Sequence, residues 1–121
     1  MEHSMKTIKT FETEEIPNPH FISARVLHSS EAAQFEHLIL EPGQEQKKHV
    51  AYTAFHLYIL EGTGVLEAGG ETITLSADML VEMPPETRHR LVNNGTSRLR
   101  VLNVKAPRPA KPTHIVAEKK S

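Results

Sequence analysis

The chain has no cysteine among its 121 residues. This absence excludes a disulfide framework, a thiolate metal site and a cysteine nucleophile, so any metal ion would be held by nitrogen and oxygen ligands. Zinc-ribbon proteins are excluded for the same reason. Aromatic residues are also scarce, with two tyrosines and four phenylalanines, which argues against an aromatic platform for nucleic-acid bases.

Long apolar runs and blocks of like charge are missing as well. No segment approaches the ~20 apolar residues needed to cross a bilayer, and the charged start, MEHSMKTIKTFETEEI, lacks the apolar stretch of a signal peptide. A net charge of −1 without a basic block offers no electrostatic footprint for nucleic acid or an anionic membrane. We therefore expect a soluble, cytoplasmic protein whose partner is a small molecule or another protein chain.

Short apolar segments with a period of two follow one another after residue 20. The segments HFISARVLHS and AAQFEHLILEPG alternate in this way, and six further apolar runs come after them at short intervals. The pairs Gly69-Gly70 and Asn94-Gly95 each predict a two-residue hairpin turn. About eight short strands in one small domain predict an all-β fold, a jelly-roll barrel of two antiparallel sheets.

The ends of the chain differ in composition from the middle. We assign residues 20–105 to the barrel and residues 1–19 to an N-terminal arm or edge strand, because polar clusters and two prolines oppose a packed element there. Residues 106–121 form a Pro-rich C-terminal tail. Its three prolines exclude a central strand, so we expect it to run over the surface or onto a partner.

Two segments carry the histidines of greatest interest, PGQEQKKHVAYTAFHLYILEGTG and DMLVEMPPETRHRLVNNG. Together they resemble the two signature segments of the cupin superfamily, and the resemblance covers residues 35–105. It is the resemblance of a small single-domain cupin of the RmlC-like, conserved-barrel type, and it implies a jelly-roll β-barrel. The positions that match are Gly43, His49 and Gly62 in the first segment and Pro84, His89 and Asn93 in the second.

The sequence departs from the cupin pattern at four positions. Ala51 stands where the family has its second histidine, Phe55 stands at the glutamate position, and two glycines are replaced by Asp78 and Glu86. In metal-bearing cupins the histidines and the glutamate bind one divalent ion. The resemblance therefore implies that His49 and His89 hold a transition metal ion such as Mn, Fe, Ni or Zn, but two imidazoles make a weak site without a third ligand.

His56 is the candidate third ligand. It lies seven residues after His49, and this odd separation places the two side chains on opposite faces of a regular strand. A bulge in VAYTAF would bring His56 to the cavity; without one, Phe55, Leu57 and Ile59 face it. His37 is either a further cavity nitrogen or a hydrogen-bonded core residue. The remaining histidines lie near turns or termini and are expected to be exposed: His3, His20, His28 and His114.

Three functions are compatible with these features, and the fold does not decide among them or between enzyme and non-enzyme. The first is binding of a small organic ligand without metal, in a pocket with His49 and His89 as polar anchors. The apolar lining predicted for this pocket consists of Tyr52, Phe55, Leu57 and Met83. Ala51 and Phe55 favour this reading, because they enlarge and dry the space that an ion would fill.

The second function is a metal-dependent cupin enzyme of the oxygenase or isomerase class, in which the ion is held by His49, His89 and a third ligand. The third is a structural or regulatory homodimer. Apolar residues occupy both parities of AFHLYILEG and RVLNV, so both faces of these strands require a cover, and a second subunit would supply one.

Overall fold

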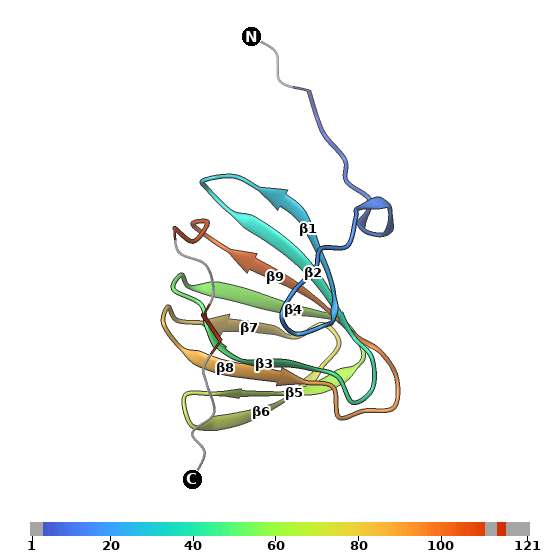
Figure 1. Ribbon diagram of the computed structural model, residues 1–121, viewed down its shortest axis with the longest axis vertical. Helices are drawn as coiled ribbons and strands as arrows, with labels where there is room; N and C mark the ends of the chain where they lie inside the picture. Colours follow the sequence, from blue (N-terminus) through green and yellow to red (C-terminus); the bar gives the residue numbers. More distant parts are fainter. Residues whose placement is uncertain (1–3, 111–113, 116–121) are drawn as a thin grey trace.

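The chain forms two antiparallel five-stranded sheets that pack face to face (Figure 1). The structure is a computed structural model and describes residues 4–110 and 114–115. The strand order is β1-β2-β9-β4-β7 in the first sheet and β10-β3-β8-β5-β6 in the second. The elements are η1 (Thr10–Glu12), β1 (Ser23–Ser29), β2 (Gln34–Leu40), β3 (Glu45–Val50), β4 (Phe55–Glu61), β5 (Thr63–Ala68), β6 (Glu71–Ser76), β7 (Leu80–Met83), β8 (Arg88–Val92), β9 (Leu99–Lys105) and β10 (His114–Ile115). The predicted all-β jelly roll is confirmed.

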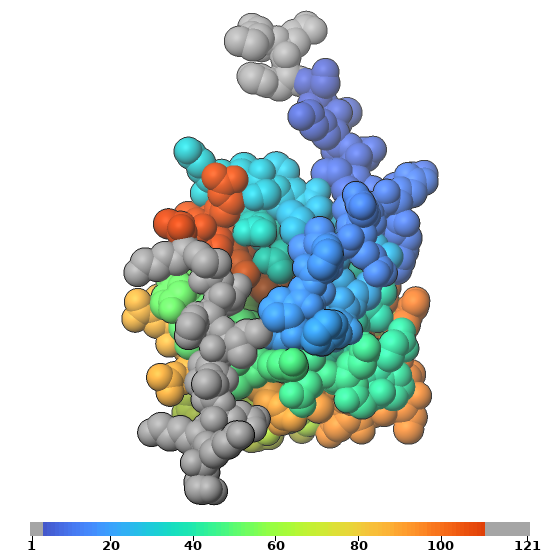
Figure 2. Space-filling view, in the orientation of Figure 1, coloured from blue at the N-terminus to red at the C-terminus, as the bar shows by residue number. Residues whose placement is uncertain are grey.

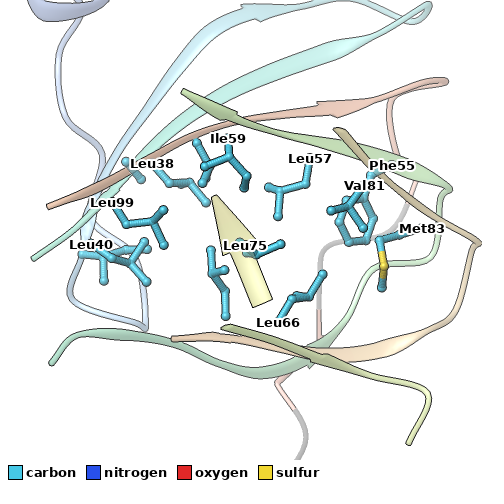
Figure 3. Packing of buried hydrophobic residues seen from close by; sticks show 14 of the residues in the cluster. Leu38, Leu40, Phe55, Leu57, Ile59, Leu66, Leu75, Val81, Met83 and Leu99 are labelled. Carbon is cyan, nitrogen blue, oxygen red and sulfur yellow. The ribbon is translucent and has the colours of Figure 1, made fainter. Parts of the chain in front are cut away.

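The core lies between the two sheets, where alternate residues of each strand meet (Figure 3). In β9, for example, Leu99 and Val101 are fully buried while Arg100 between them is only partly covered. This is the result expected from the period-two pattern, since successive side chains of a strand point to opposite faces. Leu66 and Leu75 supply the facing contacts from the second sheet. Burial of this apolar surface is the main stabilising contribution to the fold.

The two predicted hairpins have different outcomes. Gly69 and Gly70 join β5 to β6 with φ values of 56° and 81°, as a tight hairpin requires. The hairpin predicted at Asn94-Gly95 is wrong, because β8 and β9 belong to different sheets and this segment crosses between them. The crossing loop is held by the fully buried Asn93, whose Nδ2 donates to the carbonyl oxygens of Leu40 and Ser97.

Asp78 and Glu86, which replace two cupin glycines, both have positive φ values, 68° and 63°. The backbone conformation that glycine adopts easily is therefore kept, although it is unfavourable for residues with a side chain. Two hydrogen bonds hold it in place: the Asp78 N–H donates to the Ile59 carbonyl and the Glu86 N–H donates to the Ala51 carbonyl.

The N-terminal arm crosses the outer face of the first sheet. Phe11 packs edge-on against His37 with ring centroids 5.7 Å apart, and the guanidinium groups of Arg25 and Arg100 lie over the Phe11 ring. Farther along, the Ile16 N–H donates to the carbonyl of β1 residue Ala24. In the C-terminal tail, β10 pairs with β3 at the edge of the second sheet. Within the described residues, no helix has the length and apolar character needed to span a membrane.

Candidate functional site

Two buried histidines meet on neighbouring strands of the second sheet. His49 of β3 and His89 of β8 are register partners, and their ring centroids lie 4.0 Å apart. Their exposed fractions are 4% and 3%. A register shift between Gln46 and His49 marks a bulge in β3. Because Gln46 pairs with the core residue Leu91, the extra residue in the bulge lets both Gln46 and His49 face the interior.

Hydrogen bonds fix the tautomers of both rings. The Nδ1 atom of His49 donates to the Lys47 carbonyl at 2.7 Å, and the Nδ1 atom of His89 donates to the Thr87 carbonyl at 3.0 Å. Since a carbonyl oxygen can only accept, each Nδ1 carries the proton and each Nε2 presents a lone pair.

Burial also keeps the two rings neutral. Loss of hydration, with a smaller contribution from the neighbouring His89 ring, lowers the pKa of His49 to about 3. Burial likewise lowers the pKa of His89 below its ordinary value. Near pH 7 the site therefore presents two uncharged imidazoles that act as hydrogen-bond acceptors at Nε2.

His20 joins this pair from the segment that precedes β1. Its ring centroid lies 5.2 Å from that of His49, and its Nδ1 accepts the Lys47 backbone N–H at 2.8 Å. The expectation that His20 is exposed is wrong, since it is half-buried, and burial lowers its pKa. The local signal was the preceding Asn18, whose Oδ1 accepts the N–H groups of His20 and Ile22 and so turns the chain toward β3.

A buried ion pair stands on the opposite wall. Lys105 Nζ lies 3.0 Å from Glu36 Oε1, with side-chain exposures of 9% and 16%. This pair was not predicted from the sequence, although the strand parity of the two residues indicates it. Lys105 shares its face of β9 with Leu99 and Val101, and Glu36 shares its face of β2 with Leu38.

A cavity of about 480 Å³ lies between these two walls. It is lined by β1, β2 and the Lys105 end of β9 on one side, by Gln46 and His49 of β3 on the other, and by residues 108–110. Residues 16–20, which we call the strap, cover it, and Figure 2 shows the N-terminal segment in blue lying across this side of the barrel.

The predicted pocket residues are distributed differently from the expectation. Of the six, His49 lines this cavity, whereas Phe55, Leu57 and Met83 belong to the apolar core. Tyr52 lies partly buried in the loop between β3 and β4. The segment that follows His49 leaves the second sheet and enters the first, where Phe55 and Leu57 face the core.

Sequence comparison agrees with this architecture. Residues 36–105 match the family described as Cupin domain. The chain belongs to the cupin family. This cupin is 32% identical over 77 residues to the tetracenomycin polyketide synthase protein TcmJ of Streptomyces glaucescens, and 32% identical over 76 residues to polyketide synthase CurC of Streptomyces cyaneus. These matches cover 60% and 62% of the cupin, which spans about half the length of each relative, 52% and 49%.

Solved structures place the same fold in distant relatives. The cupin resembles TT1209 from Thermus thermophilus at 30% identity with a TM-score of 0.73, over 87% of the cupin and 100% of that chain. It resembles the polyketide cyclase RemF from Streptomyces resistomycificus at a TM-score of 0.81, over 97% of the cupin and 89% of that chain. Identity to RemF is 17%, so this second similarity concerns the fold alone.

The cupin does not assemble the metal ligand set that the resemblance implied. Phe55, at the glutamate position, packs against His89 with ring centroids 4.7 Å apart, and Ala51 is buried. His56 lies on the outer face of β4 opposite Glu82, because Phe55 and Leu57 take the inner face. Across the described part of the chain, no group of three or more histidine, aspartate or glutamate residues is placed to hold an ion. The donor set does not fit a three-ligand metal site.

His37 is likewise separated from the pair. It lies on the outer face of β2, where Arg100 Nε donates to its Nε2 at 3.1 Å. Burial, together with the charges of Arg100 and Arg25, lowers the pKa of His37 to about 4. His37 is therefore a neutral, hydrogen-bonded residue beneath the N-terminal arm, and it belongs neither to the cavity nor to the core between the sheets.

Proposed function

We propose that this cupin binds a small organic molecule in the cavity beneath the strap, without a metal ion. The observation that carries this proposal is the cavity itself, which has the volume typical of a small-molecule site and combines apolar walls with a few polar groups. His49 offers an acceptor at Nε2, and Lys105 retains donor capacity beyond its bond to Glu36.

The departures from the cupin pattern support a metal-free site. An alanine and a phenylalanine occupy two ligand positions, and the phenylalanine ring covers His89. The names of the two curated relatives support an organic ligand, because they refer to polyketide synthesis. Hydroxylated aromatic ketones therefore belong in any ligand panel, beside simple aliphatic and aromatic acids, alcohols and amides.

The test is an NMR titration of the ¹⁵N-labelled full chain with each compound of that panel. Binding is monitored through changes in the backbone amide chemical shifts. Saturable binding with shifts concentrated in the strap, β1 and the Lys105 end of β9 is expected. A matched pair of variants locates the site: Val26→Trp fills the cavity, whereas Val65→Trp adds the same bulk on the outer face of β5. Binding lost in the first variant and kept in the second supports the proposal. Absence of binding by every compound, or equal effects of the two variants, overturns it.

The metal-dependent alternative rests on the two Nδ1 anchors. Such bonds orient histidine ligands in metal sites, where the other ring nitrogen binds the ion. His49 and His89 would supply two nitrogens to an ion that acts as a Lewis acid. The described residues supply no third ligand, so no step of a reaction is assigned to such an ion.

We also propose that the protein self-associates through the outer face of β4 and β7. Leu80 is 56% exposed and Leu60 36% exposed on these adjacent strands. Exposed apolar neighbours of this kind mark protein contacts more often than isolated ones do. Light scattering at micromolar concentration is expected to give twice the chain mass, and Leu80→Lys is expected to reduce it to the monomer. A monomer in the unmodified protein contradicts this proposal.

A further inference from the structure

The cavity has two chemically different ends. At one end, Ser29, Gln34 and Lys105 form a row across β1, β2 and β9, because they are register partners. At the other end, Ala24 and Leu38 are partners in the same two strands. The two rows are four residues apart along β2, which corresponds to about 13 Å at the usual rise of a strand.

The apolar end is closed by the strap. Ile16 and Ile22 line the cavity there beside Leu38, and the strap is fixed to β1 by the hydrogen bond from the Ile16 N–H to the Ala24 carbonyl. Two bonds from the Asn18 side chain hold the turn that follows. This end can therefore cover an apolar group, and the polar strap residues Asn18 and His20 already bond to backbone groups of Ile22 and Lys47.

The polar end carries an excess of positive charge. Lys105 is paired with Glu36, but Arg108, which also lines the cavity, has no carboxylate partner in the described part of the chain. Arg108 is held at this end by neutral groups, since its Nη1 lies 3.4 Å from Ser29 Oγ and its backbone N–H donates to the Glu31 carbonyl. The lining thus contains two cations and one anion, and its histidines are neutral.

A single negative charge on a ligand balances this arrangement. The guanidinium of Arg108 has a planar set of donors that matches a carboxylate, and several of its N–H groups have no protein partner among the described residues. A second negative charge would lie near Glu36 and be repelled. Arg108 is exposed, so a neutral ligand would leave its guanidinium to water, whereas a carboxylate would pair with it.

From these two ends we infer that the ligand is an amphipathic monocarboxylic acid. Its carboxylate lies against Arg108 and Lys105, and its apolar body extends beneath the strap toward Leu38. This inference rests on the proposed function and names the class of ligand that the cavity accepts. Hydroxylated ketones and alcohols that lack a carboxylate are therefore expected to bind more weakly than the acids of the panel.

The test uses three probes that separate the head from the body: 4-phenylbutanoate, its neutral amide and acetate. Calorimetric titration of the full chain is expected to show 4-phenylbutanoate binding on the order of tenfold more tightly than the amide, as a charge-assisted contact predicts. Acetate is expected to bind more weakly than either, because it leaves the apolar end empty.

A matched pair of arginine variants locates the carboxylate. Arg108→Gln is expected to weaken 4-phenylbutanoate by about tenfold and leave the amide unchanged. Arg88→Gln removes the same charge from an exposed position of β8 that is outside the cavity lining, and is expected to change neither.

The outcomes separate this inference from the proposed function. Three results would overturn the monocarboxylate inference and leave ligand binding in place. They are equal affinity for the acid and its amide, equal affinity for acetate and 4-phenylbutanoate, and equal effects of the two arginine variants. Absence of binding by these probes and by the whole panel overturns both.

Discussion

Across the pairing of β3 with β8, His49 and His89 place their ring centroids 4.0 Å apart, and each donates Nδ1–H to the carbonyl of the residue two positions earlier. The same hydrogen bond from Nδ1 to the backbone thus occurs in both strands. It fixes each neutral ring with its Nε2 lone pair directed away from the backbone carbonyl. The predictions below follow from this site and from the frame around it.

Acid should weaken the fold because His49 is kept neutral. Its pKa is about 3 in the folded chain against 6.5 as the ordinary value, so between these two values the unfolded chain binds a proton that the folded chain excludes. The free energy of unfolding should therefore fall as the pH decreases from 6.5 toward 3, with a slope of about 1.4 kcal/mol per pH unit for each such histidine. Urea denaturation at pH 7, 6, 5 and 4 measures this slope.

The control for this slope is a second histidine variant. His49→Gln should make the slope shallower, whereas the same change at the exposed His28 should leave it unchanged. A slope that does not differ between the two variants would show that His49 titrates normally in the folded chain.

The buried pair of Glu36 and Lys105 should be sensitive to removal of one partner. Glu36→Gln leaves the Lys105 ammonium buried without its carboxylate, and we expect a loss of about 3–5 kcal/mol in the free energy of unfolding. The double variant Glu36→Leu with Lys105→Met removes both charges and should recover most of that loss. Chemical denaturation of these two variants measures the recovery, and a double variant no more stable than Glu36→Gln would speak against a direct interaction.

Glu86→Gly should stabilise the protein. Its φ of 63° favours glycine, so relief of backbone strain should outweigh the added freedom of the unfolded chain by about 0.5–1 kcal/mol. Glu86→Ala removes the same carboxylate but keeps the strain, and should not stabilise to this extent. Equal thermal shifts for the two variants would assign the effect to charge instead of conformation.

Gly62 should tolerate a side chain less well than Gly70. Both have similar positive φ values, 87° and 81°, but a Cβ atom at Gly62 would overlap the Arg98 carbonyl oxygen, whereas the space at Gly70 is open. Gly62→Ala should therefore destabilise the fold by about 1–3 kcal/mol more than Gly70→Ala. Denaturation of both variants gives this difference, and its absence would mean that the β4–β5 turn yields easily.

The period-two pattern was sufficient to predict the sheets and the inward side of β4. Phe55, Leu57 and Ile59 face the core, which is the arrangement expected without a bulge in VAYTAF. The bulge that the structure does contain lies earlier, between Gln46 and His49. Periodicity alone did not locate it, because Lys47 and Lys48 have no apolar partner that would reveal a change of face.

The meeting of His49 with His89 could be predicted only through the resemblance to cupins, since the two residues are forty positions apart. The contribution of His20 could not be predicted, because it depends on how the strap folds back over β3. Strand parity contained the information for Glu36 and Lys105, but a charged residue at the end of a strand is usually solvated, and burial becomes visible only once its partner is known.

The central claim is that this barrel holds an organic ligand without a metal ion, and elemental analysis of the freshly purified full chain tests it most directly. We expect less than about a tenth of an equivalent of any transition metal, because the described residues form no three-ligand site, and a melting temperature that a chelator leaves unchanged. One equivalent of bound metal, lost together with thermal stability on chelation and absent in His49→Ala, would contradict it.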